Sequence, residues 1–211
     1  MKKFKLTSEF IVDISGVKLF RIKALIEFGN VKAGDLGGYI EKEENLSHMG
    51  NAWVSGNAQV SGDARVSGNA RVSGDAQVFG DARVSGNARV FGDAQVSGNA
   101  QVSGNARVFG DAQVSGNARV FGDAQVSGDA RVSGDARVSG DKDYAYAHGF
   151  GSCNRTTTFF RLKDGDVGVR CGCFYGTLAQ FRDKVCETHG ETKKAQEYLM
   201  LADLMEIRFK N

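Results

Sequence analysis

The middle of the chain is a strict six-residue repeat of hydrophobic and polar positions. A valine stands at every sixth position from Val54 to Val138, always in the setting Ala-x-Val-(Ser or Phe)-Gly-(Asn or Asp). Alanine and valine are two positions apart, so on a strand they point to one side, while the residue between them and the residue after them point to the other. The Gly-Asn or Gly-Asp pair tolerates the left-handed backbone conformation of a sharp corner. Each hexad therefore predicts one short strand and one corner, with alanine and valine inside.

Two chain paths satisfy this pattern: antiparallel hairpins that turn at every corner, or a coil that turns the same way each time and stacks on itself. A meander of such short strands would leave its alanine and valine face uncovered, because no amphipathic helix interrupts the repeat to pack on it. A triangular coil encloses that face and pairs every backbone group with the coils above and below. We therefore predict an all-β solenoid with three hexads per coil, about 24 Å long at roughly 4.8 Å per coil.

The repeat resembles that of the hexapeptide-repeat left-handed β-helix proteins, which place an aliphatic residue at one position and a small residue four positions later, here Val60 and Ala64. This resemblance covers residues 51–141 and implies a left-handed parallel β-helix, although the general rule for parallel crossovers favours the right-handed form. Segments before and within the start of the repeat resemble the entry segment of YdcK-like proteins: Ala33–Glu41, Asn45–Ser47 and Trp53–Val54. Segments after the repeat are similar to a C-terminal module of phage and prophage proteins: Thr156–Arg161, Cys171–Phe174 and Thr188–Gly190.

The pattern divides the chain into three parts. Residues 1–50 form an N-terminal β-hairpin cap and lead-in, residues 51–141 form the hexapeptide-repeat β-helix, and residues 142–211 form a small α+β module. The cap is expected to be a hairpin of residues 4–10 and 17–28. An open solenoid end exposes core side chains and unpaired strand edges, so we expect the cap to prevent end-to-end association.

The C-terminal module is predicted to have the order β-β-α-α. Its hairpin is expected over residues 156–163 and 167–173, around the Asp-Gly turn between them. A capping box that begins at Thr177 predicts the start of the first helix, and Gly190 predicts its end. The second helix is expected from about residue 191 to residue 209, with apolar residues at helical spacing.

Net charge gives no reason to expect a polyanionic partner. The chain has 27 basic and 25 acidic residues, a formal net charge of +2. We therefore expect neither nucleic acid nor a membrane surface as partner. The stretch from Phe4 to Val17 contains acidic residues and no long apolar run, which favours neither a signal peptide nor a transmembrane helix. A cytoplasmic protein is expected.

Proteins with this repeat are commonly classed as acyltransferases, which implies acetyl-CoA as the acyl donor and a basic histidine that deprotonates the acceptor. His148, directly after the repeat, is the candidate base; the other histidines are His48 and His189. No loop interrupts the hexads to form a wall of a coenzyme A pocket. The competing interpretation of His148 is a structural role where the repeat, which forms the shaft of the molecule, meets the C-terminal module. We expect no catalytic residue and no cofactor, with acyl transfer by His148 as the alternative.

The cysteines allow two interpretations. Cys171 and Cys173 would lie on one face of a strand, and Cys153, Cys186 or His189 could complete a tetrahedral zinc site. The spacing matches no familiar zinc motif, and buried thiols that behave as small hydrophobic side chains explain a Cys-x-Cys pair in a strand. We expect no metal site.

Outward positions of the repeat carry two further residue types. Phenylalanine replaces serine at Phe79, Phe91, Phe109 and Phe121, but only Phe91 and Phe109 share a side in an 18-residue frame, so no single apolar stripe results. The eight arginines of the repeat are balanced by aspartates at its corners, which favours a mixed-charge surface. Flat faces of a three-sided coil favour a homo-oligomer, with a trimer preferred.

The least repetitive polar cluster follows the shaft and is the predicted ligand-binding site: Asn154, Arg155, Thr156, Thr157 and Thr158. Its several donors suit an anionic or carbonyl-rich ligand, although an ordinary polar entry to a hairpin would have the same composition. We interpret the protein as a non-catalytic binding or scaffold protein that presents its C-terminal module to a protein partner or small anionic ligand. The alternatives are acyl transfer and a phage-type accessory protein that binds and blocks a host protein or a small signalling molecule.

Overall fold

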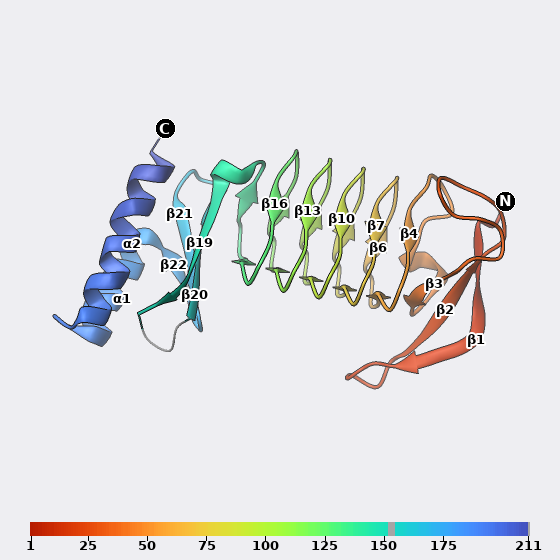
Figure 1. Ribbon diagram of the computed structural model, residues 1–211, viewed down its shortest axis with the longest axis horizontal. Coiled ribbons are helices and arrows are strands. Elements are labelled where there is room, and N and C mark those ends of the chain that lie inside the picture. Colours follow the sequence, from red (N-terminus) through yellow and green to blue (C-terminus); the bar gives the residue numbers. More distant parts are fainter. Residues whose placement is uncertain (152–154, 211) are drawn as a thin grey trace.

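The protein is a rod with a different cap at each end (Figure 1). The computed structural model describes residues 1–151 and 155–210. Its middle is a parallel β-solenoid with one two-residue strand at each repeat valine. These strands are β4 (Trp53–Val54), β5 (Gln59–Val60), β6 (Arg65–Val66), β7 (Arg71–Val72), β8 (Gln77–Val78), β9 (Arg83–Val84), β10 (Arg89–Val90), β11 (Gln95–Val96), β12 (Gln101–Val102), β13 (Arg107–Val108), β14 (Gln113–Val114), β15 (Arg119–Val120), β16 (Gln125–Val126), β17 (Arg131–Val132) and β18 (Arg137–Val138).

Parallel pairing fixes three hexads to each coil. Val90 pairs with Val72 in the preceding coil and with Val108 in the following one, a separation of three hexads in each direction. Backbone hydrogen bonds run between coils, as from the Gln95 N–H to the Ala112 carbonyl at 2.9 Å. The predicted triangular coil is confirmed and the meander is excluded.

The corners explain the invariant glycine. The corner glycines between Gly56 and Gly134 have φ values of 61° to 72°, a conformation that L-residues with a side chain rarely adopt. A Cβ atom at Gly86 would also lie 2.9 Å from the backbone nitrogen of Gly104 in the next coil. Conformation and close approach therefore both require glycine, so the coils can stack closely only with this residue at the corner.

The solenoid has three faces that differ in their outward side chains. The glutamine face is formed by β5, β8, β11, β14 and β17; the arginine–phenylalanine face by β4, β7, β10, β13 and β16; and the third face by β6, β9, β12, β15 and β18. Inside, the repeat alanines and valines are fully buried and form one continuous core. Face composition therefore varies while the core stays constant.

The N-terminal cap is a hairpin of β1 (Phe4–Val12) and β2 (Lys18–Ala24), as expected, followed by β3 (Leu36–Ile40). Strand β3 pairs in parallel with β5, so the hairpin extends the sheet of the glutamine face beyond the first coil. A short 3-10 helix, Glu43–Asn45, follows, and Leu46 then pairs with Val66 on the third face. Parallel pairing therefore begins before the first hexad.

The C-terminal module has a four-stranded antiparallel sheet and two helices. Its elements are the 3-10 helix Asp141–Asp143, then β19 (Tyr144–Phe150), β20 (Arg155–Arg161), β21 (Val167–Cys171), β22 (Phe174–Thr177), α1 (Leu178–His189) and α2 (Lys193–Phe209). The predicted hairpin and both helices are confirmed, including the capping box of Thr177 and Gln180. The prediction of only two strands was wrong, because Tyr144–Phe150 pairs with β20 and Phe174–Thr177 pairs with β21, so both are strands of the same sheet.

Strand β20 joins the module to the shaft. Phe160 is fully buried in the solenoid core, whereas its neighbour Phe159 is fully buried among the helices. The hydroxyl of Thr158 accepts a hydrogen bond from the Arg131 N–H of the last coil at 2.9 Å. One strand with two buried faces thus closes the solenoid and anchors the module.

Asp143 is the buried carboxylate at this junction. Burial raises its pKa, but the hydroxyl and N–H of Ser139, at 2.5 and 2.9 Å, together with the Gly140 N–H, outweigh burial, so the pKa lies below the ordinary value. The carboxylate therefore stays ionised and ties the end of the last coil to the start of the module.

Candidate functional site at the shaft-to-module junction

A hollow of about 580 Å³ lies where the last coil meets the C-terminal sheet. It is lined by Asp129, Arg131, His148, Arg155, Thr156, Gly172 and Cys173. The first two come from the glutamine face, at the corner before β17 and in β17 itself, and the others from β19, β20 and the turn between β21 and β22. The site therefore exists only because the module packs on that end of the shaft.

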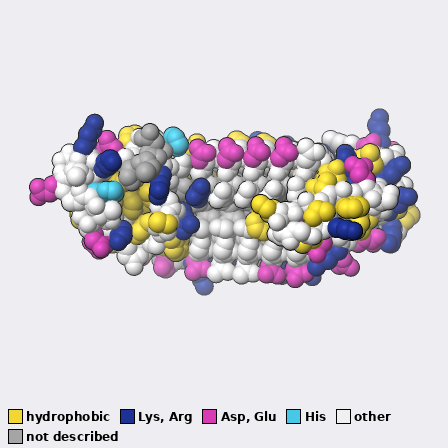
Figure 2. Space-filling view, turned by 90° about the horizontal axis from the view of Figure 1, so that it is seen from below, with side chains coloured by type: hydrophobic (Ala, Val, Ile, Leu, Met, Phe, Trp, Pro, Cys, Tyr) yellow, Lys and Arg dark blue, Asp and Glu magenta, His cyan; other side chains and the backbone are white. Residues whose placement is uncertain are grey.

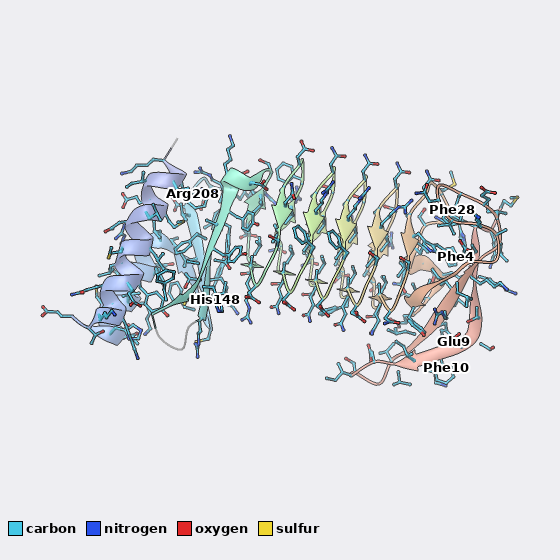
Figure 3. All side chains as sticks on the ribbon, viewed as in Figure 1. Phe4, Glu9, Phe10, Phe28, His148 and Arg208 are labelled. Carbon is cyan, nitrogen blue, oxygen red and sulfur yellow. The ribbon has the colours of Figure 1, made fainter. Side chains whose placement is uncertain are left out.

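His148 stands at the centre of the polar contacts (Figure 3). Its Nδ1 atom lies 2.8 Å from the Thr156 hydroxyl and 3.8 Å from a carboxylate oxygen of Asp129. The imidazole is more than half exposed. These contacts orient the ring toward the hollow and join the shaft corner to β20.

Two guanidinium groups give the hollow a basic character. Within residues 1–151 and 155–210, neither Arg131 nor Arg155 forms an ion pair with a carboxylate. Asp129 is the one acidic side chain of the lining, so with a neutral His148 the lining carries a net charge of +1. Free guanidinium groups beside a hydroxyl donor are suited to bind a carboxylate or phosphate.

Arg131 is the departure from a regular column. The same outward position on the glutamine face is Gln59, Gln77, Gln95 and Gln113 in the four preceding coils. Only the coil that touches the module has arginine there. Arg131 could have been predicted from the sequence, because it replaces the glutamine that recurs every 18 residues at this position.

Acidic side chains form a row that ends at the site. Asp75, Asp93, Asp111 and Asp129 occupy the same corner of successive coils. Figure 2 shows a row of acidic side chains along one edge of the shaft, with a histidine beside its end toward the C-terminal module, and further acidic side chains along the opposite edge. The aspartates and arginines of the repeat therefore balance in number but are sorted into separate columns.

The predicted ligand residues fall into three groups. Arg155 and Thr156 line the hollow, together with the candidate base His148. Thr157 and Thr158 are buried, and their hydroxyls contact the Cys171 sulfur at 3.2 Å and the Arg131 N–H. Asn154 lies outside the described residues. The cluster is thus divided between the lining of the hollow and the packing behind it.

The cysteines are not arranged as one strand face. Cys171 ends β21, whereas Cys173 lies in the turn before β22, so the expectation that both share a strand face was wrong. Cys171 contacts the Tyr198 hydroxyl at 3.8 Å, and Cys186 is exposed on α1. Among the described residues no three His, Cys, Asp or Glu side chains are grouped as a metal site requires; Cys153 lies outside them.

The other two histidines contact residues that do not line the junction hollow. The His48 ring stacks on Phe4 with centroids 4.4 Å apart, and its Nδ1 accepts the Lys3 N–H at 3.2 Å. His189 ends α1 near Tyr198. His148 is therefore the histidine that lines the junction hollow. No helix in the described part of the chain is long and apolar enough to cross a membrane.

One family model matches the shaft. The YdcK Beta solenoid repeat model matches seven segments: residues 58–74, 64–80, 76–90, 82–98, 100–112, 112–128 and 124–140. The matches cover less than half of the chain and include neither end module. No curated protein matches the chain significantly. The repeat type is thereby identified, while the likeness of the C-terminal module to phage proteins stays a prediction.

Proposed function

We propose that this protein, whose shaft is built from YdcK-type β-solenoid repeats, is a non-catalytic scaffold that binds an anionic group at the junction hollow. The observation that carries the proposal is the pair Arg131 and Arg155, one from the shaft and one from the module, with no carboxylate partner among the described residues. Thr156 and His148 add a hydroxyl and an imidazole beside them. A carboxylate or phosphate would thus be held by donors from both parts.

The rigid shaft explains why such a site is formed at its end. Coils joined by continuous backbone hydrogen bonds hold Asp129 and Arg131 in place, and Thr158 ties β20 to the same coil. Preorganised donors lose little conformational entropy when a ligand binds. The shaft therefore acts as a fixed platform and the module supplies the second wall.

Calorimetric titration with inorganic phosphate, acetyl-CoA and an aspartate-rich peptide would test the proposal and separate its ligand sources. Binding of any of these anions should weaken about tenfold or more in Arg131→Gln, because a charged hydrogen bond is lost. Glutamine occupies that position in the four preceding coils, so the variant should fold. Arg119→Gln, on the third face, is the matched control and should bind as the wild type does. Equal losses in both variants, or no binding, would reject the proposal.

Acyl transfer is the second candidate because His148 has both an acidic neighbour and a hydroxyl neighbour. The Asp129 carboxylate would stabilise the imidazolium that forms when His148 accepts a proton. This reading expects saturable acetyl-CoA binding and loss of turnover in His148→Ala. The scaffold reading expects no turnover of acetyl-CoA in the wild type, so one assay for free thiol release separates the two.

The scaffold proposal extends to a protein partner at the C-terminal module. Met200, Leu204 and Ile207 are exposed on α2 with spacings of four and three residues, opposite the buried stripe that contains Tyr198 and Ala202. A partner with an apolar surface would cover these side chains. A phage-type accessory role predicts a stoichiometric complex with a host protein, and Leu204→Asp should abolish that complex while the junction hollow still binds its anion.

Subunit association is part of the same proposal. Three flat faces favour a trimer, because each can pack along its length against another copy. Phe79 and Phe121 are exposed on two different faces, so each face offers a different contact. Native mass spectrometry at micromolar concentration should detect three subunits, and a monomer alone would reject this part.

A further inference from the structure

A pair of phenylalanine rings forms a short stack on the arginine–phenylalanine face. Phe91 and Phe109 occupy the same position in successive coils, and their rings are parallel within 1°, with centroids 5.0 Å apart. That separation is close to the rise of one coil, roughly 4.8 Å. The stack therefore repeats with the solenoid itself.

The stack stops where serine replaces phenylalanine. Ser73 holds the same position one coil before Phe91. A hollow of about 450 Å³ opens there, lined by Asn30, Arg71, Ser73, Arg89 and Phe91. A third ring, placed one coil before Phe91, would stand over Ser73 inside this hollow. The hollow therefore lies at the position that a third ring of the stack would occupy.

The N-terminal cap supplies a wall of this hollow. The tight turn of Phe28 and Val31, which exchange two backbone hydrogen bonds, holds Asn30 beside the shaft. Phe28 packs edge-on against Trp53 at 5.4 Å, and this contact fixes the turn on the arginine–phenylalanine face. Asn30 adds an amide that can donate and accept hydrogen bonds.

Two arginines give the hollow its charge. Arg71 and Arg89 follow each other in successive coils, and among the residues that the structure describes neither has an ion pair. The corner before the arginines carries Asn69 and Asn87, whose amides are linked to each other at 3.1 Å and bring no negative charge. The corner after Ser73 and Phe91 carries Asp75 and Asp93. Among the described residues no acidic side chain lines the hollow. A negative group there would meet two guanidinium groups, while the carboxylates of Asp75 and Asp93 stay outside the lining of the hollow.

We propose that this hollow binds a planar aromatic ring that carries an anionic group. The ring stacks on Phe91 above Ser73, and its carboxylate or phosphate is held by Arg71 and Arg89 with Asn30 at the rim. Stacking on an aromatic side chain tolerates any flat ring, whereas the paired arginines demand negative charge. The ligand class is therefore a nucleotide or an aromatic carboxylate. The site is separate from the junction hollow and does not depend on the function proposed for it.

Ligand-observed saturation-transfer NMR with calorimetry would test this site on the full chain carrying Arg131→Gln, in which the anion binding proposed for the junction hollow is weakened. The probes are adenosine monophosphate, benzoate, uncharged adenosine and inorganic phosphate. Adenosine monophosphate or benzoate should bind, and whichever binds identifies the source of the ring. Adenosine and phosphate should each bind at least about tenfold more weakly, because adenosine lacks the anionic group and phosphate lacks the aromatic ring.

The repeat offers substitutions that it already accommodates. Ser73→Phe would fill the hollow with a third stacked ring and should abolish binding, while Phe91→Ser should weaken it at least about tenfold. Arg71→Gln should remove the preference for the charged probe. Phe121→Ser, a change of the same kind on the third face, is the control and should bind as the wild type does.

Three results would overturn the proposal. The first is the absence of binding by both aromatic anions. The second is unchanged affinity in Ser73→Phe with an intact circular dichroism spectrum, since a filled site cannot bind. The third is equal binding of phosphate and adenosine monophosphate, which would show that the ring makes no contribution.

Discussion

The shaft and the C-terminal module bury their cores in opposite ways. In the shaft the same alanine and valine recur in every coil, so each buried side chain has equivalent neighbours above and below. In the module the buried side chains have non-equivalent neighbours, as Phe159, Phe181 and Tyr198 show by their edge-on ring contacts. A repeated core leaves the outward positions free to change, whereas a unique core constrains most of its chain.

Both candidate sites follow from this difference. Each lies where an outward column of the shaft changes residue type, at Arg131 for the junction hollow and at Ser73 for the aromatic hollow. Each also uses a wall from a non-repeating end, His148 from the module or Asn30 from the cap. Chemistry on this molecule is therefore expected at breaks in the repeat.

The largest effect should come from a charge inside the shaft. Val96→Asp places a carboxylate in a core of alanine and valine with no polar partner, and should cost roughly 4 kcal/mol or more. Urea unfolding followed by circular dichroism measures the loss. Ser97→Asp changes the next residue, which faces outward, and should change the free energy of unfolding by no more than about 0.5 kcal/mol. Equal effects of the two variants would show that the inward face has been misidentified.

The next largest loss of stability should be confined to the C-terminal module and should leave the shaft folded. Phe181→Ala removes a ring that contacts Phe159 and Tyr198 in the module core and should cost about 3–5 kcal/mol. Hydrogen exchange should then become fast in residues 155–209 and stay slow in residues 60–126. Fast exchange in both regions would mean that shaft and module unfold as one unit.

A pH-dependent effect should come from the cap. Lys3 is almost fully buried and donates to the Ala52 carbonyl at 2.8 Å, and burial lowers its pKa from 10.5 to about 8. The unfolded chain then binds this proton more tightly than the folded chain, so burial of the charged amine costs stability below pH 8, and stability rises between about pH 8 and 10.5. The full rise from this group should be about 2–3 kcal/mol.

Urea unfolding of Lys3→Met checks this expectation. The variant has no group that titrates at this position, so its unfolding free energy should rise less with pH than that of the wild type. Lys142→Met, at the other end of the shaft and exposed, is the control and should keep the wild-type rise. Parallel curves for Lys3→Met and wild type would contradict the assignment.

The smallest effect should come from removing a whole coil. Deletion of residues 94–111 joins Asp93 to Ala112 in register, keeps the lining residues of both hollows, shortens the shaft by one coil and removes Phe109 from its stack on Phe91. Affinity at the junction should stay within about twofold, because each coil contacts only its neighbours. Calorimetry of the shortened protein measures it. A large loss would show that the two ends communicate through the shaft.

Much of the fold could be predicted because its signals are local. The spacing of alanine and valine, the corner glycines and the capping box at Thr177 each act within a few residues, and all were interpreted correctly. Strands β19 and β22 were missed, although each pairs with a strand that is its neighbour in the sequence. The polar cluster was only partly informative, since Thr157 and Thr158 turn into the packed interior while Arg155 and Thr156 turn outward.

By itself, the sequence determined the solenoid, since a six-residue period with alanine and valine inside closes its core only as a three-sided coil. It also determined the 18-residue columns in which Arg131 and the pair Phe91 and Phe109 differ from the other residues of their columns. Only the tertiary structure decided which side chains from the ends meet those columns. The hollow around His148 depends on how β20 anchors the module, and the one beside Asn30 depends on Phe28 packing against Trp53. These contacts join residues far apart in the chain, so no local pattern encodes them.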